Sequence, residues 1–401
     1  MNNNLKNILL GITTALLFSA FIYFEEFNLT FKLVNTIFGI SALALFLYIP
    51  KRAVLIAGFL IGFLWFYWIG YSFKYQGVAY MTPIVTLGFG FIYMLFFGTL
   101  AVTNKVYLRA ILLFSLSFFE PFDWNWLQIE VLFVDSYIGL FKYQLALVLF
   151  ALTLPKYVTN NLKYYPLLII LLALNFSAPT QIESKLKIML ASTNIKQDYK
   201  WTREALNPTI KLLFSKIDKA ISQKYDLIVL PESAFPLYMN KNQALKNALL
   251  EKSEKISIVV GSLLKENGNL YNVSYLFDDR EYKVAKKMVL VPFGEYIPLP
   301  KFAQEFINNT FFSGSSDFIG ANAPTDFVIK GEVFRNAICY EATCSEIYEG
   351  ELSFVIAISN NAWFEPSIEP TIQKLLMRYY ARKNGVTIYH SANVSGTGVI
   401  K

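Results

Sequence analysis

The chain has 401 residues, 55% of them hydrophobic and 17% aromatic, and it carries a formal net charge of +7. Charged side chains make up only 16% of it, against about 25% in an average soluble protein. The single histidine, His390, argues against a histidine-based triad or a multi-histidine metal site. The sequence also lacks any nucleic-acid-binding motif, which argues against a nucleic-acid partner.

The shortage of charge is confined to the first part of the chain. Residues 1–178 carry 16 of the 65 charged side chains, and residues 179–401 carry the other 49. The sequence therefore predicts two domains, a membrane domain over 1–178 and a water-soluble domain over 179–401.

The first domain contains apolar segments of membrane-spanning length. A helix needs about 20 predominantly apolar residues to cross a bilayer, within a range of about 17–25. Seven segments are candidates, and the fifth and seventh are short enough to be partly buried among the others. The candidate spans are 5–24, 31–49, 53–73, 79–102, 107–119, 137–155 and 163–177.

Basic residues mark every second boundary between these segments, whereas the alternate connections are acidic or carry a single lysine. By the positive-inside rule, the N-terminus is cytoplasmic, and seven crossings place 179–401 on the opposite side, the periplasm of a Gram-negative cell. Lys142 is the clear ionisable residue within a span, and it lies close enough to the outer end to snorkel. This pattern argues against a transporter.

The second domain alternates between short apolar runs and helical patterns. Such alternation predicts a layered α/β domain, in which catalytic groups gather at strand ends. Strands are predicted over 187–193, 226–231, 256–262, 271–278, 333–339, 353–359 and 386–392. Helices are predicted over 202–223, 241–254, 343–350 and 369–384.

Three chemically distinctive residues stand at or near the ends of predicted strands: Glu232, Lys287 and Cys339. A carboxylate, an amine and a thiol are the parts of a covalent acyl-transfer site, acting as general base, oxyanion stabiliser and nucleophile. Each also has a plainer interpretation when taken alone: a solvated loop glutamate, a basic surface stretch and a buried apolar cysteine.

Two neighbouring residues carry further alternatives. Glu295 lies in a Pro-Phe-Gly-Glu turn between prolines, which either fixes a carboxylate rigidly or is simple turn chemistry. Cys344 is either a structural cysteine or the disulfide partner of Cys339 in an oxidising compartment, and that disulfide would consume the nucleophile.

Taken together, the segments around these residues resemble the carbon–nitrogen hydrolase, or nitrilase, superfamily. The segments are Pro231-Glu232, Lys287 with Val291-Pro-Phe-Gly-Glu-Tyr296, Cys339-Tyr-Glu341 and Ser359-Asn-Asn-Ala-Trp-Phe364. The resemblance implies an αββα sandwich with a Glu–Lys–Cys triad. With membrane helices in front of it, the chain is similar to the apolipoprotein N-acyltransferase family over essentially its whole length.

That resemblance implies a bacterial enzyme of the inner membrane, multi-pass, with its catalytic domain in the periplasm. Its acyl donor would be a phospholipid, usually phosphatidylethanolamine, attacked at the sn-1 ester by Cys339 to give a thioester and a lysophospholipid. The acceptor would be the α-amino group of the S-diacylglyceryl-cysteine of an apolipoprotein. Neither a metal nor an organic cofactor is implied, and a monomer is expected because nothing signals an oligomer.

The resemblance also assigns roles to individual residues. Glu232 would act as general base and acid, and Lys287 with the Tyr340 backbone N–H would hold the oxyanion. Supporting carboxylates would be Glu295 and Glu341. The aromatic residues placed near the substrate would be Trp201, Trp363 and Tyr340.

The chain departs from the family pattern in three places. Relatives usually continue with another strand pair and a final membrane helix, which a chain ending at Lys401 is expected to lack. Asn361 stands where an aspartate is usual, and the family's histidine in the following helix is replaced near Gln373. The stretch Phe302–Phe318, with Phe306, Phe311 and Phe312, is either an arm that dips into lipid or ordinary core.

Two other functions remain open from the residues. One is a membrane-anchored amidase or nitrilase that acts on a soluble substrate and releases its acyl group to water. The other is a transporter or scaffold with an inactive hydrolase domain. Acyl trapping on Cys339 and its dependence on phospholipid separate these from acyl transfer.

Overall fold

The computed structural model describes residues 2–159, 161–176, 178–296 and 318–401. Contacts divide the chain into two compact units, residues 1–178 with 366–375, and residues 179–365 with 376–401. The expected arm residues Phe306, Phe311 and Phe312 lie outside the described residues.

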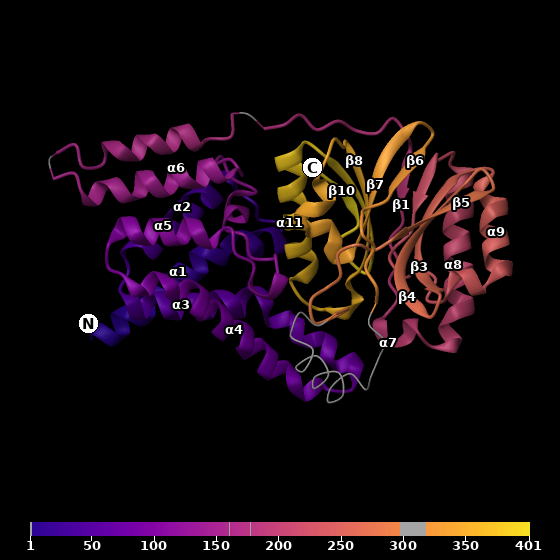
Figure 1. The fold of residues 1–401 in the computed structure, drawn as a ribbon, viewed down its shortest axis with the longest axis horizontal. Coiled ribbons are helices and arrows are strands. Elements are labelled where there is room, and N and C mark those ends of the chain that lie inside the picture. Colours follow the sequence, from indigo (N-terminus) through magenta and orange to yellow (C-terminus); the bar gives the residue numbers. More distant parts are fainter. Residues whose placement is uncertain (1, 160, 177, 297–317) are drawn as a thin grey trace. The chain divides into compact units, whose positions relative to one another are not determined.

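The first unit is helical (Figure 1). Its α-helices are α1 (Asn3–Glu26), α2 (Lys32–Tyr48), α3 (Lys51–Phe66), α4 (Thr82–Gly98), α5 (Val106–Leu116) and α6 (Lys142–Thr153). Short 3-10 turns extend α3 and flank α4. Among the described residues, three continuous segments are long and apolar enough to cross a membrane: Asn3–Glu26, Lys51–Tyr75 and Ala79–Val102. The helices α2 and α5 are apolar but shorter.

The last two expected spans take a less regular form. The α-helix of the segment 137–155 begins only at Lys142, because the residues before it pair with a later strand-like stretch. The Gly139 N–H donates to the Ala173 carbonyl at 2.9 Å, and the Asn175 N–H donates to the Tyr137 carbonyl at 2.9 Å. The segment 163–177 contains the 3-10 run η7 (Tyr165–Ala173) in place of an α-helix.

Small residues bring α3 and α4 into close contact. A Cβ added to Gly58 would lie 2.6 Å from the Tyr93 carbonyl, and one added to Gly62 would lie 2.4 Å from the Phe89 carbonyl. Glycines one turn apart allow two membrane helices to approach backbone to backbone, which increases van der Waals contact where lipid supplies no hydrophobic driving force.

Two basic residues of this unit reach buried partners. The Lys142 ammonium lies 2.6 Å from a carboxylate oxygen of Glu130, a residue that is fully buried. The expectation that Lys142 snorkels is therefore incomplete, since the sequence around it does not reveal this partner. Arg109 is also buried, and its guanidinium donates at 2.6 Å to the Ile49 carbonyl at the C-terminus of α2. A cation there complements the helix dipole.

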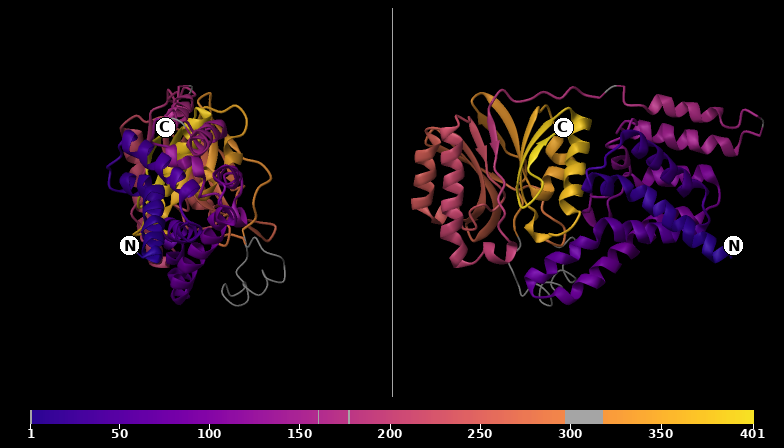
Figure 2. Two further views of the ribbon diagram at one scale, coloured as in Figure 1. Left: turned by 90° about the vertical axis from the view of Figure 1, so that its left-hand side faces the viewer. Right: turned by 180° about the vertical axis from the view of Figure 1, so that it is seen from behind.

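The second unit contains two five-stranded sheets within the described residues (Figure 2). The first has the order β1 (Ile188–Leu190), β2 (Leu227–Val229), β3 (Ser257–Glu266), β4 (Asn269–Asp278) and β5 (Glu281–Lys286). The second has the order β10 (Gly398–Ile400), β9 (Thr387–Asn393), β8 (Phe354–Asn360), β7 (Glu332–Ile338) and β6 (Asp326–Ile329). Three consecutive strands of each sheet are parallel, β1–β2–β3 and β7–β8–β9.

The two sheets pack face to face and are covered by helices. The core between the sheets includes Val229 and Val259 of the first sheet and Ile338 and Ile356 of the second. The outer face of the first sheet packs on α8 (Arg203–Ser222) and α9 (Gln243–Ser253). The part of α11 (Glu369–Asn384) in this unit covers the second sheet (Figures 1 and 2). This is the expected αββα sandwich.

All seven predicted strands of this unit are present, and three further strands were not predicted. Of the additional strands, β5 is a mostly polar strand at the edge of its sheet, and β6 and β10 have only four and three residues. Strands of these kinds are hard to recognise from an apolar pattern in sequence. The helix predicted over 343–350 is wrong, because only a 3-10 turn forms at Ser345–Tyr348. Arg335 holds that turn by donating to the carbonyls of Ile347 and Glu349, each at 3.0 Å.

Candidate active site

The three predicted triad residues follow the ends of strands in the second unit. Glu232 comes three residues after β2, Cys339 follows β7 directly, and Lys287 follows β5 directly. In sheets with parallel strands, side chains that act on ligands gather beyond the carboxyl ends of the strands. Charge interactions join the three residues, since the pKa of Lys287 responds to both Glu232 and Cys339.

Cys339 opens a tight turn with an unusual backbone. Its φ is +58°, and the 3-10 turn Cys339–Thr343 begins at this residue. A left-handed conformation costs a residue with a Cβ about 1–2 kcal/mol, so the surrounding fold must impose it. The thiol is partly exposed, whereas Cys344 is buried and its thiol donates to the Tyr340 carbonyl at 3.4 Å. Both cysteines are thiols here, so the nucleophile is not consumed by a disulfide.

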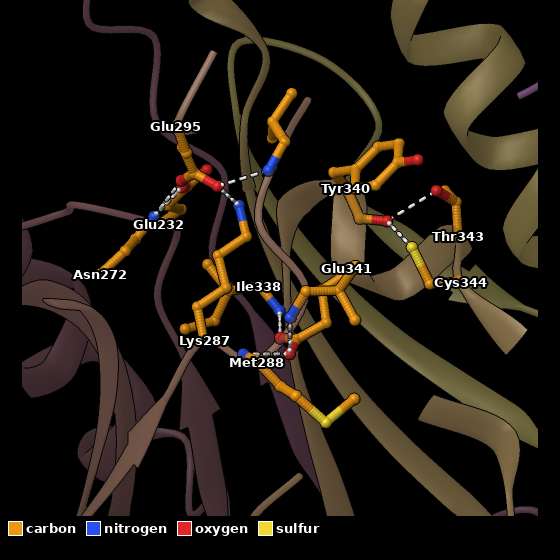
Figure 3. Close-up of polar contacts among 12 residues, drawn as sticks. Glu232, Asn272, Lys287, Met288, Glu295, Ile338, Tyr340, Glu341, Thr343 and Cys344 are labelled. Carbon is orange, nitrogen blue, oxygen red and sulfur yellow. Dashed lines mark hydrogen bonds and ion pairs between the residues drawn. The ribbon is translucent and has the colours of Figure 1, made fainter. Parts of the chain in front are cut away.

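Glu232 is held from several sides. Its carboxylate accepts a 2.7 Å hydrogen bond from the Asn272 amide on β4 (Figure 3). Its backbone lies against Gly261 of β3, where an added Cβ would be only 2.6 Å from the Glu232 Cα. The residue after it, Ser233, has a φ of +46°. A side chain at position 261 would therefore displace the glutamate, and the glycine is required by this close approach.

Lys287 is almost fully buried and is paired with a carboxylate. Its ammonium lies 2.7 Å from a carboxylate oxygen of Glu295. Burial alone would lower the pKa of Lys287, but the negative charges of Glu295, Cys339 and Glu232 reverse this and raise it above its ordinary value. The amine is therefore a permanent cation at neutral pH, as an oxyanion stabiliser must be.

Glu295 links the lysine to the rest of the network. One carboxylate oxygen accepts from the Val291 N–H at 2.9 Å, and the other accepts from the Asn272 amide at 3.3 Å. The turn around it includes Phe293 at a φ of +60° and a bond from the Glu295 N–H to the Val291 carbonyl at 2.9 Å. Asn272 thus bridges two carboxylates, Glu232 and Glu295 (Figure 3).

Glu341 ties the cysteine turn to the strand end that carries Lys287. One of its oxygens accepts from the Ile338 N–H at 2.8 Å, and the other accepts from the Met288 N–H at 2.7 Å (Figure 3). Burial raises the pKa of Glu341 to about 7, although these backbone donors and Lys287 act in the opposite direction. Glu341 therefore connects the turn at Cys339 with the segment that follows Lys287.

The aromatic residues assigned from the sequence differ in their surroundings. Tyr340 is buried, and its carbonyl accepts from the Thr343 hydroxyl at 2.6 Å. Trp201 ends the short helix α7 (Gln197–Lys200) and is 46% exposed. Trp363 is partly buried in the 3-10 turn that follows β8. Hydrogen bonds and charge interactions join the three predicted triad residues, Glu295 and Glu341 into one network, and the roles of Trp201 and Trp363 stay predictions.

Two residues of the site were not assigned from the sequence. Asn272 stands out as a buried amide within the apolar strand β4. Lys200 precedes Trp201 directly, and its buried ammonium donates to the Glu232 carbonyl at 3.1 Å. A lysine beside an exposed tryptophan reads as a surface residue in sequence, so only the fold reveals its burial.

The arrangement can perform nucleophilic acyl chemistry. It brings together a thiol on a constrained turn, a carboxylate oriented by an amide, and a buried cation beside both. A thiol, a carboxylate and a cation are the kinds of group that covalent acyl transfer requires.

Comparison with known protein families divides the chain as the fold does. The family described as "Apolipoprotein N-acyltransferase integral membrane domain" matches residues 5–176. The family described as "Carbon-nitrogen hydrolase" matches residues 189–399, which include the whole network around Lys287.

Individual relatives match over nearly the whole chain. An apolipoprotein N-acyltransferase from Wolinella succinogenes is 39% identical over 397 residues, covering 98% of this chain and 96% of the relative. One from Helicobacter pylori is 36% identical over 384 residues, covering 94% of this chain and 89% of the relative. A solved CN-hydrolase superfamily protein from Xanthomonas campestris covers 53% of this chain and 77% of its own, at 14% identity and a TM-score of 0.40.

Proposed function

We propose that this chain, which belongs to the apolipoprotein N-acyltransferase family, transfers an acyl chain from a phospholipid to an apolipoprotein through a thioester on Cys339. As a member of that family it is a bacterial membrane acyltransferase of lipoprotein biosynthesis. The acceptor is the α-amino group of an S-diacylglyceryl-cysteine, and the donor is a glycerophospholipid, with phosphatidylethanolamine the first to test.

In the first half-reaction, Glu232 takes the proton of the Cys339 thiol, and the thiolate sulfur attacks the carbonyl carbon of the phospholipid ester. Lys287 and the Tyr340 N–H stabilise the oxyanion that forms. When the tetrahedral intermediate collapses, the carbon–oxygen bond to glycerol breaks. Glu232 returns its proton to the leaving oxygen, which gives a lysophospholipid and an acyl-thioester.

In the second half-reaction, the α-amino group of the acceptor attacks the thioester carbonyl. Glu232 takes a proton from the attacking nitrogen, and the carbon–sulfur bond breaks. The sulfur then regains a proton from Glu232, so the enzyme returns to its starting state and an amide has formed. Donor and acceptor occupy the site in turn, which is a ping-pong sequence.

One observation carries this proposal: the continuous set of contacts from Lys287 through Glu295 and Asn272 to Glu232, all beside Cys339. A buried cation that stays charged has a clear use where negative charge develops in a transition state. The apolar helices of the first unit supply a reason for lipid substrates, because an acyl donor in a bilayer must be reached from the membrane.

The test is mass spectrometry of the full chain in detergent after incubation with phosphatidylethanolamine. The wild type should gain the mass of one acyl group on the peptide that contains Cys339, and neutral hydroxylamine should remove it. Cys339→Ala should gain nothing. A wild-type protein with a reduced thiol and no adduct would overturn the proposal.

A second step separates acyl transfer from hydrolysis. The acyl-enzyme is given either buffer or a peptide that carries an N-terminal diacylglyceryl-cysteine. Acyl transfer predicts fast loss of the thioester only with the peptide, together with a new amide on it. Rapid release of free fatty acid without the peptide would instead favour a membrane-anchored amidase.

We also propose that the protein lies in the inner membrane with its hydrolase unit in the periplasm. The support is the alternation of basic and acidic connections between the apolar segments. In a background with Cys339 and Cys344 replaced by serine, Glu251→Cys and Asn104→Cys each introduce one exposed thiol. In spheroplasts, a membrane-impermeant maleimide should label position 251 and spare position 104; the reverse pattern would overturn this orientation.

A further inference from the structure

We propose that Lys200 is a positioning residue for the reaction: its ammonium holds the backbone of Glu232 in place and favours the thiolate form of Cys339. The inference rests on the proposed function, because it assigns Lys200 to the same site. Lys200 is the last residue of α7 and is only 1% exposed. Its ammonium donates to the Glu232 carbonyl at 3.1 Å.

The helix that carries Lys200 is fixed at its other end. Gln197, the first residue of α7, accepts a 2.9 Å hydrogen bond from the Asn360 amide at the end of β8. The side-chain Oδ1 of Asn360 in turn accepts from the side-chain amide of Asn393, at the end of β9, at 2.8 Å. Asn393 also donates to the Ile195 carbonyl at 2.8 Å. The start of α7 is thus tied at Ile195 and Gln197 to the ends of β8 and β9, which limits the movement of Lys200.

The charge of Lys200 is not neutralised by direct pairing. In the described part of the chain, no carboxylate oxygen lies within 4.0 Å of its ammonium, and its hydrogen-bond partner is a neutral carbonyl. Lys287 differs, because it contacts Glu295 at 2.7 Å. Burying an ion costs several kcal/mol unless nearby groups compensate for it. The compensation available to Lys200 is the charge of Glu232 and Cys339.

The titration of Lys200 is consistent with this setting. Burial lowers the pKa of Lys200 to about 8, while Glu232 and Cys339 act to raise it. The ammonium is therefore the major form at neutral pH. Because a charge interaction is mutual, the same ammonium favours the thiolate form of Cys339. The charged and titratable groups around this site come from α7, the segments after β2 and β5, and the turn after β7, and they are Lys200, Glu232, Lys287, Glu295, Cys339 and Glu341.

Lys200 and Lys287 therefore have different proposed roles. Lys287 is locked to Glu295 on the oxyanion side of the proposed mechanism. Lys200 approaches from α7 and contacts the backbone of the general base, on the segment whose other side is pressed against Gly261. Removing Lys200 should loosen the glutamate and make the thiolate harder to form, without touching the substrate directly.

The test measures the pH dependence of Cys339 alkylation by iodoacetamide in the full chain in detergent, with peptide mapping to separate it from Cys344. The variants are Lys200→Met, which removes the charge and the donor, and Lys200→Gln, which keeps a donor without charge. Lys196→Met is the matched control, because Lys196 lies one turn earlier and is exposed. Both Lys200 variants should shift the profile to higher pH by about 0.5–1 unit, whereas the control should not.

Thioester formation from phospholipid supplies the second readout. Lys200→Met should slow it about tenfold or more, and Lys200→Gln should be slowed less because it can still bind the Glu232 carbonyl. Unshifted alkylation profiles in folded Lys200 variants would overturn the inference. Loss of a cooperative unfolding transition in both variants would also overturn it, because Lys200 would then be a residue of folding.

The two proposals fail in different ways. Absence of a thioester in the wild type removes the proposed function, whereas alkylation needs no lipid and still reports on the thiol. A normal wild-type thioester with unaffected Lys200 variants removes only the role of Lys200.

Discussion

The membrane unit and the hydrolase unit use the same device, a glycine at a backbone contact, for different purposes. In the membrane unit, Gly58 and Gly62 let α3 approach the carbonyls of α4. In the hydrolase unit, Gly261 lets β3 approach the segment that carries Glu232. In all three cases an added Cβ would come within 2.6 Å of backbone atoms.

The difference lies in what each contact positions. Along α3 and α4 it brings apolar helices together, so a change should spread into packing and assembly. At Gly261 it sets the position of a carboxylate in a hydrogen-bonded network, where a shift of about 1 Å can cost about 10²-fold in rate. A substitution at the membrane-unit glycines should therefore reduce stability more than reaction rate, whereas a substitution at Gly261 should reduce the reaction rate more than stability.

The largest expected effect is that of replacing Cys339, which tests whether the hydrolase unit carries the reaction. Cys339→Ser should lower thioester formation by at least about 10³-fold, because the less acidic hydroxyl is a weaker nucleophile. Cys344→Ser should stay within a few-fold of wild type, since its thiol is buried and donates to the Tyr340 carbonyl, and the serine hydroxyl can donate there too. Single-turnover acyl transfer measures both, and equal losses would contradict the assignment of the nucleophile.

The next effect concerns the buried cation of the hydrolase unit. Lys287→Met should lower the rate of thioester formation by about 10²–10³-fold, by analogy with the loss of an oxyanion-hole donor. Lys286→Met is the neighbouring control, because Lys286 is only partly buried and pairs with Glu266, outside the triad, at 2.7 Å. The same assay compares them, and a folded Lys287→Met protein with normal rates would remove the oxyanion role.

Gly261→Ala tests the contact at the general base directly. The new methyl group meets the backbone of Glu232 and Ser233, so we expect a loss of about 10–10²-fold in thioester formation. Gly398→Ala is the control, because an added Cβ there meets nothing within 4 Å. If Gly261→Ala instead unfolds the protein while its folded fraction reacts normally, Gly261 would affect stability as Gly62 does, and the proposed difference between the two units would be wrong.

The smallest effect on chemistry is expected from the membrane unit. Gly62→Ala should destabilise the protein by about 1–3 kcal/mol, because the methyl group forces α3 away from the Phe89 carbonyl. Gly88→Ala on α4 meets nothing within 4 Å and should be neutral or slightly stabilising. Thermal unfolding in detergent measures both, and acyl transfer well below the midpoint should stay within a few-fold of wild type. A large loss of rate in folded Gly62→Ala protein would show that helix packing controls the chemistry.

Sequence patterns predicted the hydrolase unit more closely than the membrane unit. Its central strands are buried apolar runs bounded by polar residues, as in Leu227–Val229 and Phe354–Asn360. The strands β6 and β10 have only four and three residues and pair with one neighbour each, so their apolar residues are too few to stand out in sequence. In the membrane unit, composition predicts apolar segments but not that 163–177 contains a 3-10 run paired with residues before α6.

Candidate site residues were predictable where they interrupt a local pattern. Cys339 and Glu232 stand out because each follows an apolar strand, and Glu295 stands out within a proline-bounded turn. Asn272 and Lys200 were missed as functional residues, since one lies within a strand and the other beside an exposed tryptophan. Their importance comes from partners far along the chain.

The sequence by itself determined the division into an apolar helical part and an α/β part and the main strands, because these depend on composition and local periodicity. It also indicated the family, through the resemblance of the segments around Glu232, Lys287 and Cys339. Only the tertiary structure decided that Asn272 bridges Glu232 and Glu295, that Lys142 pairs with Glu130, and that Lys200 is buried beneath Glu232. Burial and charge pairing depend on distances between residues remote in sequence, and these distances are set when the sheets and helices pack.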